Sequence, residues 1–149
     1  WIKIGSDSGV HDPATATYMT HPRGYGTYPR ILGRYVREEG VLGLEEAVHK
    51  MTWAVARRVG LTDRGLVLEG FAADLVVFDP ATVAERATFT DPHRLPDGVV
   101  HVVVNGTPVV RNGRATDARP GRFLRGPGAR PSRTEPAEEA PAPGRPAPR

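Results

Sequence analysis

The chain has 149 residues, of which 39% are hydrophobic and 25% are charged, and it contains no cysteine. The length suits one domain of ordinary size, and the lack of cysteine excludes disulfides, thiolate metal sites and a cysteine nucleophile. The first residues lack the layout of a signal peptide. The longest apolar runs, such as 99–104, are far shorter than the ~20 residues that span a bilayer. We therefore expect a soluble, cytoplasmic protein with no membrane partner.

The net charge of +3 is concentrated near the C-terminus. Residues 119–149 hold seven arginines, three glutamates and eight of the 15 prolines, whereas the other 118 residues carry a net charge of −1. Phe123 and Leu124 are the large apolar residues of this segment. Because so few apolar side chains cannot offset the entropy lost on ordering, we expect a disordered Pro/Arg-rich tail over 117–149. Without aromatic residues interleaved among its arginines, we expect no nucleic-acid partner.

The opening residues resemble the end of a β-strand whose start would precede residue 1. Ile2 and Ile4 alternate with Lys3, and a polar turn containing glycine follows. Since a core strand is a rare place for a natural protein to start, and Trp1 is not a methionine, we expect the chain to be the C-terminal piece of something larger.

Two helices are predicted after a loop over residues 10–28, which is rich in proline and glycine. The first begins at Pro29 and ends at Gly40. The second runs over 44–59, with acidic residues in its first turn, arginines in its last turn and Gly60 as its C-cap.

The spacing of apolar residues then changes to a period of two, which predicts strands. Residues 66–68 form a short strand and residues 73–79 a buried one. Asn105 and Gly106 separate two apolar runs, 99–104 and 107–110, and this dipeptide favours the type I′ turn of a hairpin. Asn112 and Gly113 predict a second turn.

Asp7 is the first candidate for chemistry, because it follows the opening strand at the end where α/β folds place catalytic side chains. From spacing alone, a simple turn in which the aspartate bonds its own backbone explains it as well. Arg23 is the second candidate. It lies in a loop that we expect on the same side as Asp7, where a guanidinium could hold a carboxylate through two hydrogen bonds, or could be an ordinary solvated arginine.

The histidines do not form a metal site by their spacing. His11, Asp12 and His21 match no zinc-binding pattern together with Asp7, so we expect loop residues. His49 falls in the second helix, His101 in a strand and His93 in a turn, where packing roles are expected.

Taken together, four blocks of the sequence resemble the C-terminal third of the D-aminoacylase (N-acyl-D-amino-acid deacylase) family of the amidohydrolase superfamily. The first is Ile-Gly-Ser-Asp at 4–7, and the second, which is the most specific to this family, is His-Pro-Arg-Gly-Tyr-Gly-Thr-Tyr-Pro-Arg at 21–30. The third spans 51–61, and the fourth comprises 64–70, 73–79 and 104–106. The likeness covers about residues 2–116.

The resemblance implies an α/β fragment. Residues 1–61 would be the last strand and closing helices of a metal-dependent (β/α)8 barrel, and residues 62–116 a segment of a small β-sandwich domain. Asp7 would be the general acid/base that takes a proton from a zinc-bound water and delivers it to the leaving amine. Arg23 would bind the α-carboxylate of the N-acyl-D-amino acid substrate, with Tyr25 and Tyr28 lining or supporting its loop.

The sequence also departs from this family. Ser8 intervenes before Gly9 where the family usually has glycine directly after the aspartate, and Trp53 and Val55 replace a serine and a proline. Without that proline we expect the second helix to continue unkinked. The main metal ligands of the family lie on earlier strands outside this chain, so the chain alone should neither bind zinc nor hydrolyse substrate.

Two other functions remain open from sequence. The chain could belong to another amidohydrolase, such as a cyclic amidase or dihydroorotase-like enzyme. It could also be a non-catalytic remnant or binding module. Because a severed barrel leaves open edges, we expect the isolated chain to aggregate or to depend on the missing N-terminal barrel segment as a partner.

Overall fold

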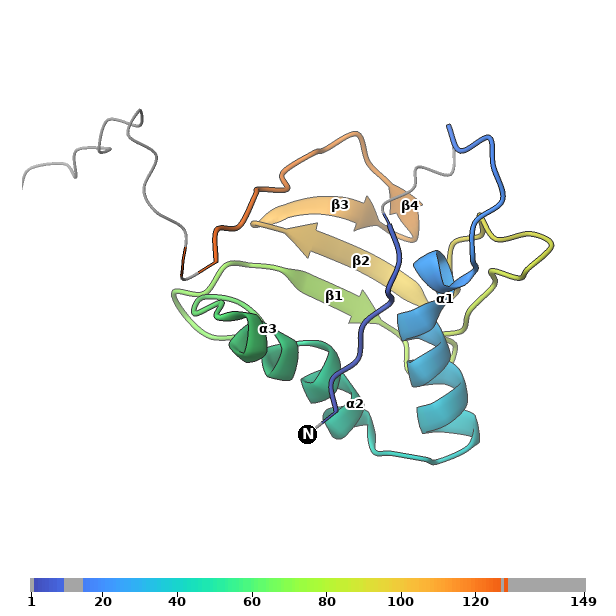
Figure 1. Cartoon of the computed structure of the whole chain (residues 1–149), viewed down its shortest axis with the longest axis horizontal. Helices are drawn as coiled ribbons and strands as arrows, with labels where there is room; N and C mark the ends of the chain where they lie inside the picture. The colour runs from blue at the N-terminus through green and yellow to red at the C-terminus, as the bar shows by residue number, and fades with distance from the viewer. Residues whose placement is uncertain (1, 10–14, 127, 129–149) are drawn as a thin grey trace, which may run out of the picture.

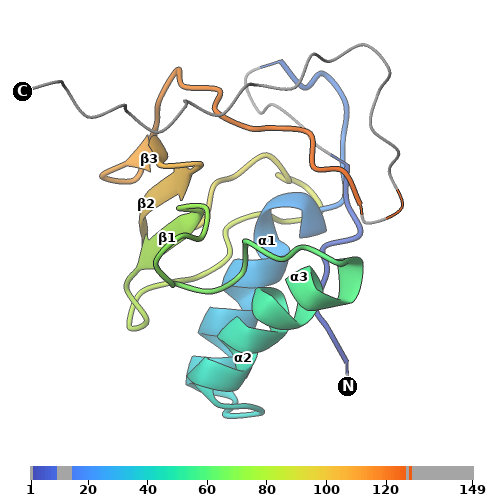
Figure 2. The same cartoon turned by 90° about the vertical axis from the view of Figure 1, so that its left-hand side faces the viewer.

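The computed structural model describes residues 2–9, 15–126 and 128. Its helical part comprises α1 (Arg23–Arg30), the π-helix η1 (Ile31–Glu38), α2 (Leu44–Met51) and α3 (Trp53–Val59). A four-stranded antiparallel sheet lies beside the helices in the order β1 (Leu75–Phe78), β2 (Val99–Val104), β3 (Thr107–Arg111) and β4 (Arg114–Ala115), as Figures 1 and 2 show. None of the helices in this described part is long and apolar enough to cross a membrane.

The first helix begins six residues earlier than the sequence predicts. Residues 23–28 are helical rather than a loop, and Pro29 lies inside the helix rather than at its start. Two glycines and a threonine lower the intrinsic helix propensity of this turn. Local hydrogen bonds compensate, because the Arg23 amide donates to His21 Nδ1 at 3.1 Å and Thr27 Oγ1 donates to the Arg23 carbonyl at 2.9 Å.

The second predicted helix is broken in two at Thr52, so the expectation of an unkinked helix is wrong. Thr52 has φ −122° and ψ −96°, outside the helical region. Its hydroxyl donates to the carbonyl of Val48 at 2.7 Å, and a threonine that bonds the backbone in this way competes with helical hydrogen bonding. The break therefore needs no proline. The predicted end at Gly60 is confirmed, with φ +79°.

The predicted hairpin is confirmed in its strands and in its turn. Asn105 and Gly106 both have positive φ, at 47° and 80°, as a type I′ turn requires. Asn112 and Gly113 form the second predicted turn with φ of 50° and 73°.

One further strand prediction is confirmed in part and two are wrong. β1 lies within the predicted range 73–79 but is shorter, and Val76 and Val77 are about half exposed rather than buried. Residues 66–68 form no strand, and the Val67 side chain is 83% exposed. Residues 2–9 are likewise irregular, because no described strand lies beside them to continue a ladder. The Ile4 amide instead donates to the Lys50 carbonyl at 3.2 Å.

The segment 79–98, which joins β1 to β2 in the chain, packs against η1 and so holds the helices and the sheet together. Val83, on this segment, is 1% exposed, and its backbone is held between two glycines. A Cβ atom on Gly33 of η1 would lie 2.5 Å from the Val83 carbonyl oxygen, and one on Gly98 would collide with the Val83 amide nitrogen. Only hydrogen atoms at both positions permit this close approach.

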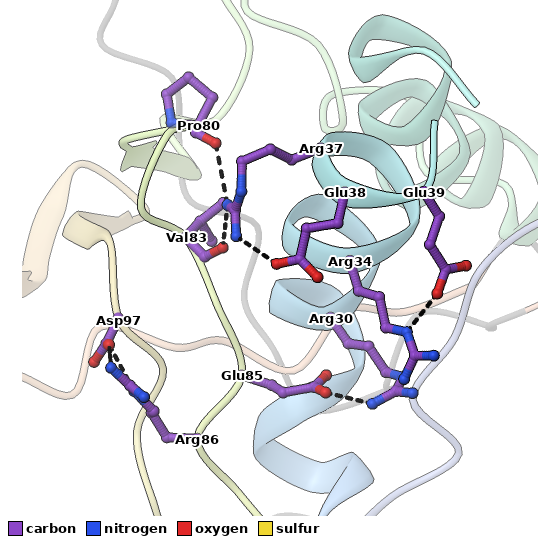
Figure 3. A network of polar contacts seen from close by, with 10 residues as sticks. All are labelled: Arg30, Arg34, Arg37, Glu38, Glu39, Pro80, Val83, Glu85, Arg86 and Asp97. Atoms are coloured by element: carbon purple, nitrogen blue, oxygen red, sulfur yellow. Dashed lines mark hydrogen bonds and ion pairs between the residues drawn. The ribbon is translucent and has the colours of Figure 1, made fainter. Parts of the chain in front are cut away.

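Polar contacts reinforce the same junction (Figure 3). The Arg37 guanidinium donates to the carbonyls of Val83 at 2.6 Å and Pro80 at 3.2 Å, and Arg30 forms an ion pair with Glu85. Arg86 bonds Asp97 across the segment, next to the isolated bridge between residues 84 and 97. These contacts fix the segment 79–98 against the helix that begins at Arg23.

Substituting Gly33 tests the importance of the close approach to Val83. Gly33→Ala should destabilise the chain by about 1–3 kcal/mol, because the new methyl group meets a backbone carbonyl that cannot give way. This loss runs against the gain expected for alanine in a helix. Urea unfolding measures it, with Gly121→Ala as the control because a Cβ there meets no atom within 4 Å. Equal stability of the two variants would contradict the packing described above.

Asp97 should give the stability of this junction a dependence on acid. The hydrogen bond from Arg86 keeps the pKa of the Asp97 carboxyl below its usual 3.8. The carboxylate therefore contributes stability that is present above the unfolded-state pKa and is lost as the pH falls through the lower folded-state value. Urea unfolding should show Asp97→Asn to be less stable than the parent chain at about pH 6, with the difference diminishing as the pH is lowered below 3.8. A difference that stays constant over this range would contradict the assignment.

Candidate active site

Asp7 and Arg23 lie in direct contact. Arg23 Nη1 is 3.2 Å from Asp7 Oδ2, which brings together two side chains from the irregular N-terminal segment and the first turn of α1. The side chains are 88% and 45% exposed, so the pair faces solvent. A paired carboxylate and guanidinium at an open surface can exchange partners with a ligand, because water and salt weaken exposed ion pairs.

The backbone of Asp7 adopts a conformation that is uncommon for residues other than glycine. Its φ is 49°, in the left-handed region, which aspartate tolerates better than most side chains. Ser8 Oγ donates to the Gly9 carbonyl at 3.2 Å in the same turn. Backbone strain of this kind gathers at functional sites, and here it accompanies a carboxylate directed at Arg23.

Arg23 lies at a position that a helix alone would not favour. The N-terminus of a helix carries partial positive charge, and no acidic residue lies in the first turn of α1. Asp7, from another segment, supplies the negative charge that this turn lacks. The backbone amides of residues 23–26 donate to His21 and Pro22, so an anion at this place would be bound by the guanidinium.

Aromatic side chains on both sides of Arg23 contact the segment 88–93. The His21 ring lies edge-to-face against Phe89, with centroids 4.9 Å apart. The Tyr25 hydroxyl is 3.2 Å from His93 Nδ1, and His93 Nε2 is 2.9 Å from the Tyr18 carbonyl. Tyr25 thus contacts the segment 88–93, whereas Tyr28 is 42% exposed.

A cleft of about 440 Å³ opens beside Arg23. It is lined on one side by residues 21–23, 26, 27 and 30 and on the other by residues 85 and 87–89. Arg30 and Glu85, which both line the cleft, form an ion pair, so their charges compensate each other. The cleft is large enough for a small organic molecule.

Metal-ligating side chains do not gather around Asp7 in the described residues. No group of three or more His, Cys, Asp or Glu there lies close enough together to hold a metal ion. His11 and Asp12 lie outside the described residues, and His49 and His101 belong to α2 and β2. One carboxylate does not make a zinc site, so the residues at hand do not fit the ion by themselves.

The chain matches the family description "Amidohydrolase family" over residues 5–110. It belongs to the amidohydrolase family. It is 49% identical to D-aminoacylase from Alcaligenes xylosoxydans xylosoxydans over 121 residues, which cover 81% of this chain and 24% of the relative. It is 44% identical to N-acyl-D-aspartate deacylase from the same organism, over 81% of this chain and 23% of that protein.

A solved structure of an amidohydrolase superimposes on this fold. It is N-acyl-D-glutamate deacylase from Bordetella bronchiseptica, complexed with zinc and a phosphonate inhibitor that mimics the tetrahedral intermediate of the reaction. The TM-score is 0.60 at 46% identity, over 65% of this chain and 21% of that one. The chain thus spans about a quarter of the length of these relatives.

His93 and Phe89 are residues of the site that sequence reasoning did not single out. The sequence Asp-Pro-His at 91–93 predicts a turn, whereas the turn in the structure lies just before it, between Thr88 and Asp91, and is closed by two hydrogen bonds. Nothing in the local pattern reveals that His93 contacts a residue 68 positions earlier. That contact depends on the path of the whole segment 79–98.

The exposure of Asp7 predicts that it contributes little to stability. Asp7→Asn should change the free energy of unfolding by no more than about 0.5 kcal/mol, because the side chain is exposed and its ion pair with Arg23 is screened by water. Urea unfolding at neutral pH measures this change, and Val83→Ala, which empties a buried site, provides the destabilised reference. A large loss in Asp7→Asn would mean that the aspartate is held for folding rather than for chemistry.

Proposed function

We propose that this chain forms the C-terminal part of a metal-dependent hydrolase that deacylates N-acyl-D-amino acids. The observation that carries the proposal is the 3.2 Å contact between Asp7 and Arg23, because it joins the two groups that this reaction requires. Membership of the amidohydrolase family and the likeness to three kinds of N-acyl-D-amino acid deacylase support the proposal.

Arg23 would hold the α-carboxylate of the substrate. A guanidinium offers two parallel N–H donors that match the two oxygens of a carboxylate, which fixes the orientation of the substrate as well as its position. The substrate carboxylate would replace Asp7 as the partner of Arg23. The scissile amide, one bond from the α-carbon, then lies near the displaced aspartate.

Asp7 would transfer the proton. Its carboxylate accepts a proton from the water that attacks the amide carbonyl, and then donates it to the leaving nitrogen as the C–N bond breaks. The products are a carboxylate and a D-amino acid. The relative from Bordetella bronchiseptica is complexed with zinc. Since the described residues do not form a zinc site, we propose that a metal would be held by residues outside this chain.

The division of the chain follows from the same proposal. Residues 1–61 would complete a (β/α)8 barrel whose other strands come from an N-terminal barrel segment. Residues 62–116, with their antiparallel sheet, would belong to a β-sandwich domain shared with that segment, and residues 117–149 would form a tail. The absence of strand pairing at residues 2–9 and the exposure of β1 are what such a division predicts.

A chimeric enzyme tests the proposed function. Residues 2–116 replace the matching segment of the Alcaligenes D-aminoacylase, and hydrolysis of N-acetyl-D-leucine is measured together with zinc content. The chimera should be active, Asp7→Asn should lower kcat by about 10²–10⁴-fold, and Arg23→Ala should act mainly by raising KM. The isolated chain should be inactive.

Matched controls are available within the chain. Glu69→Gln and Arg58→Ala change exposed charged residues away from the site and should leave activity unchanged. A chimera that binds zinc but does not hydrolyse the substrate, or that keeps full activity in Asp7→Asn, would refute the proposal. Hydrolysis of a hydantoin in place of the N-acyl-D-amino acid would assign the chain to a cyclic amidase.

A further inference from the structure

Arg23 is flanked by two aromatic contacts that come from one distant segment. His21 precedes it and meets the ring of Phe89, whereas Tyr25 follows it and meets the ring of His93 at 5.7 Å and 79°. Both partners lie on the segment 88–93. The first turn of α1 is therefore held on either side of the guanidinium by the same piece of chain.

The hydrogen bonds of His93 define its role more closely. A backbone carbonyl only accepts, so His93 Nε2, 2.9 Å from the Tyr18 carbonyl, carries the hydrogen. In the neutral ring, Nδ1 is then an acceptor, and the Tyr25 hydroxyl donates to it at 3.2 Å. His93 thereby joins the chain before α1 to the first turn of α1.

The segment that carries Phe89 and His93 has its own internal bonds. The Thr88 amide donates to the Asp91 carbonyl at 3.0 Å, and the Asp91 amide donates to Thr88 Oγ1 at 2.9 Å. Pro92, next to His93, is buried. A turn closed in this way is a firm support for the two side chains that it presents.

We propose that His93 and Phe89 are positioning residues for Arg23, which fix the direction of its guanidinium toward the substrate carboxylate. This inference rests on the proposed function of Arg23. Arg30 and Arg37 already hold the later turns of the helix against the segment 79–98. The contacts at the first turn therefore set the orientation of that turn, and with it of Arg23. Carboxylate recognition by two parallel hydrogen bonds depends on such direction, since small misplacements weaken both bonds.

The test uses the chimeric D-aminoacylase and two substrates, N-acetyl-D-leucine and its amide, which lacks the carboxylate. His93→Ala should raise KM for the acid about 3- to 10-fold with kcat within about twofold, the size expected for a lost hydrogen bond to one neutral group. The amide should be unaffected. Tyr25→Phe should behave alike and add nothing to His93→Ala, and Phe89→Leu should raise KM in the same sense.

Three variants separate positioning from a general effect on folding. His93→Gln keeps one donor and one acceptor and should restore KM, and His49→Ala, an exposed histidine on α2, should change nothing. In an Arg23→Ala background, His93→Ala should have no further effect. A rise in KM that persists in that background, or that appears equally for the amide, would overturn the inference.

Failure of the proposed function leaves the inference testable. If the parent chimera is inactive, the Arg23 side-chain Nε–H resonance is followed by ¹⁵N NMR in the 149-residue chain. It should shift in His93→Ala and Tyr25→Phe and stay in place in His49→Ala. An unchanged resonance in all three variants would show that His93 does not position Arg23, whatever the enzyme activity.

Discussion

The structure depends on the close approach of the Val83 backbone to two glycines. Gly33 comes from η1 and Gly98 from the approach to β2, so this single contact connects the helical part to the sheet. Helices pack on helices and strands on strands, and the segment 79–98 passes between them. The described core is correspondingly small, with Ala47, Ala56 and Val83 buried, together with Pro29 and Pro92. Because so few apolar side chains are buried, hydrogen bonds such as those from Arg37 to the backbone of the segment 79–98 contribute to holding the two parts together.

The candidate site inherits its geometry from this junction. The helix that Gly33 and Arg37 hold against the segment 79–98 begins at Arg23, and the same segment continues into Phe89 and His93. The position of Arg23 therefore depends both on the helix over residues 23–38 and on the segment 79–98, whose residues Phe89 and His93 contact the start of that helix. Asp7 arrives from a third segment, and the left-handed turn at that residue directs it to Arg23.

Local chemistry in the sequence was enough to predict some of this structure. The Asn-Gly turns and the glycine at the end of α3 depend on residues adjacent in the chain, and these predictions are confirmed. The break at Thr52 and the helical turn at 23–28 depend on side chains bonding the backbone, which propensity does not capture. Strand predictions failed where strand formation depends on pairing with a neighbour. Residues 66–68 are apolar enough for a strand, but no described strand lies beside them to form hydrogen bonds. The candidates Asp7 and Arg23 were proposed from motif residues, whereas the contacts of His93 depend on the tertiary path of the chain.

The ion pair between Asp7 and Arg23 has a consequence for the order of events in the proposed enzyme. Asp7 contacts one Nη atom of Arg23, so in the proposed enzyme a substrate carboxylate that binds through the same atom would compete with the aspartate for it. In that enzyme, Asp7 would be freed from Arg23 when a carboxylate-bearing molecule binds. In the absence of ligand, the ion pair would thus keep the Asp7 carboxylate bound to Arg23, and binding of the ligand would free that carboxylate to accept a proton. The amino acid left after deacylation would carry the same carboxylate, so it would compete with Asp7 for Arg23 until it is released.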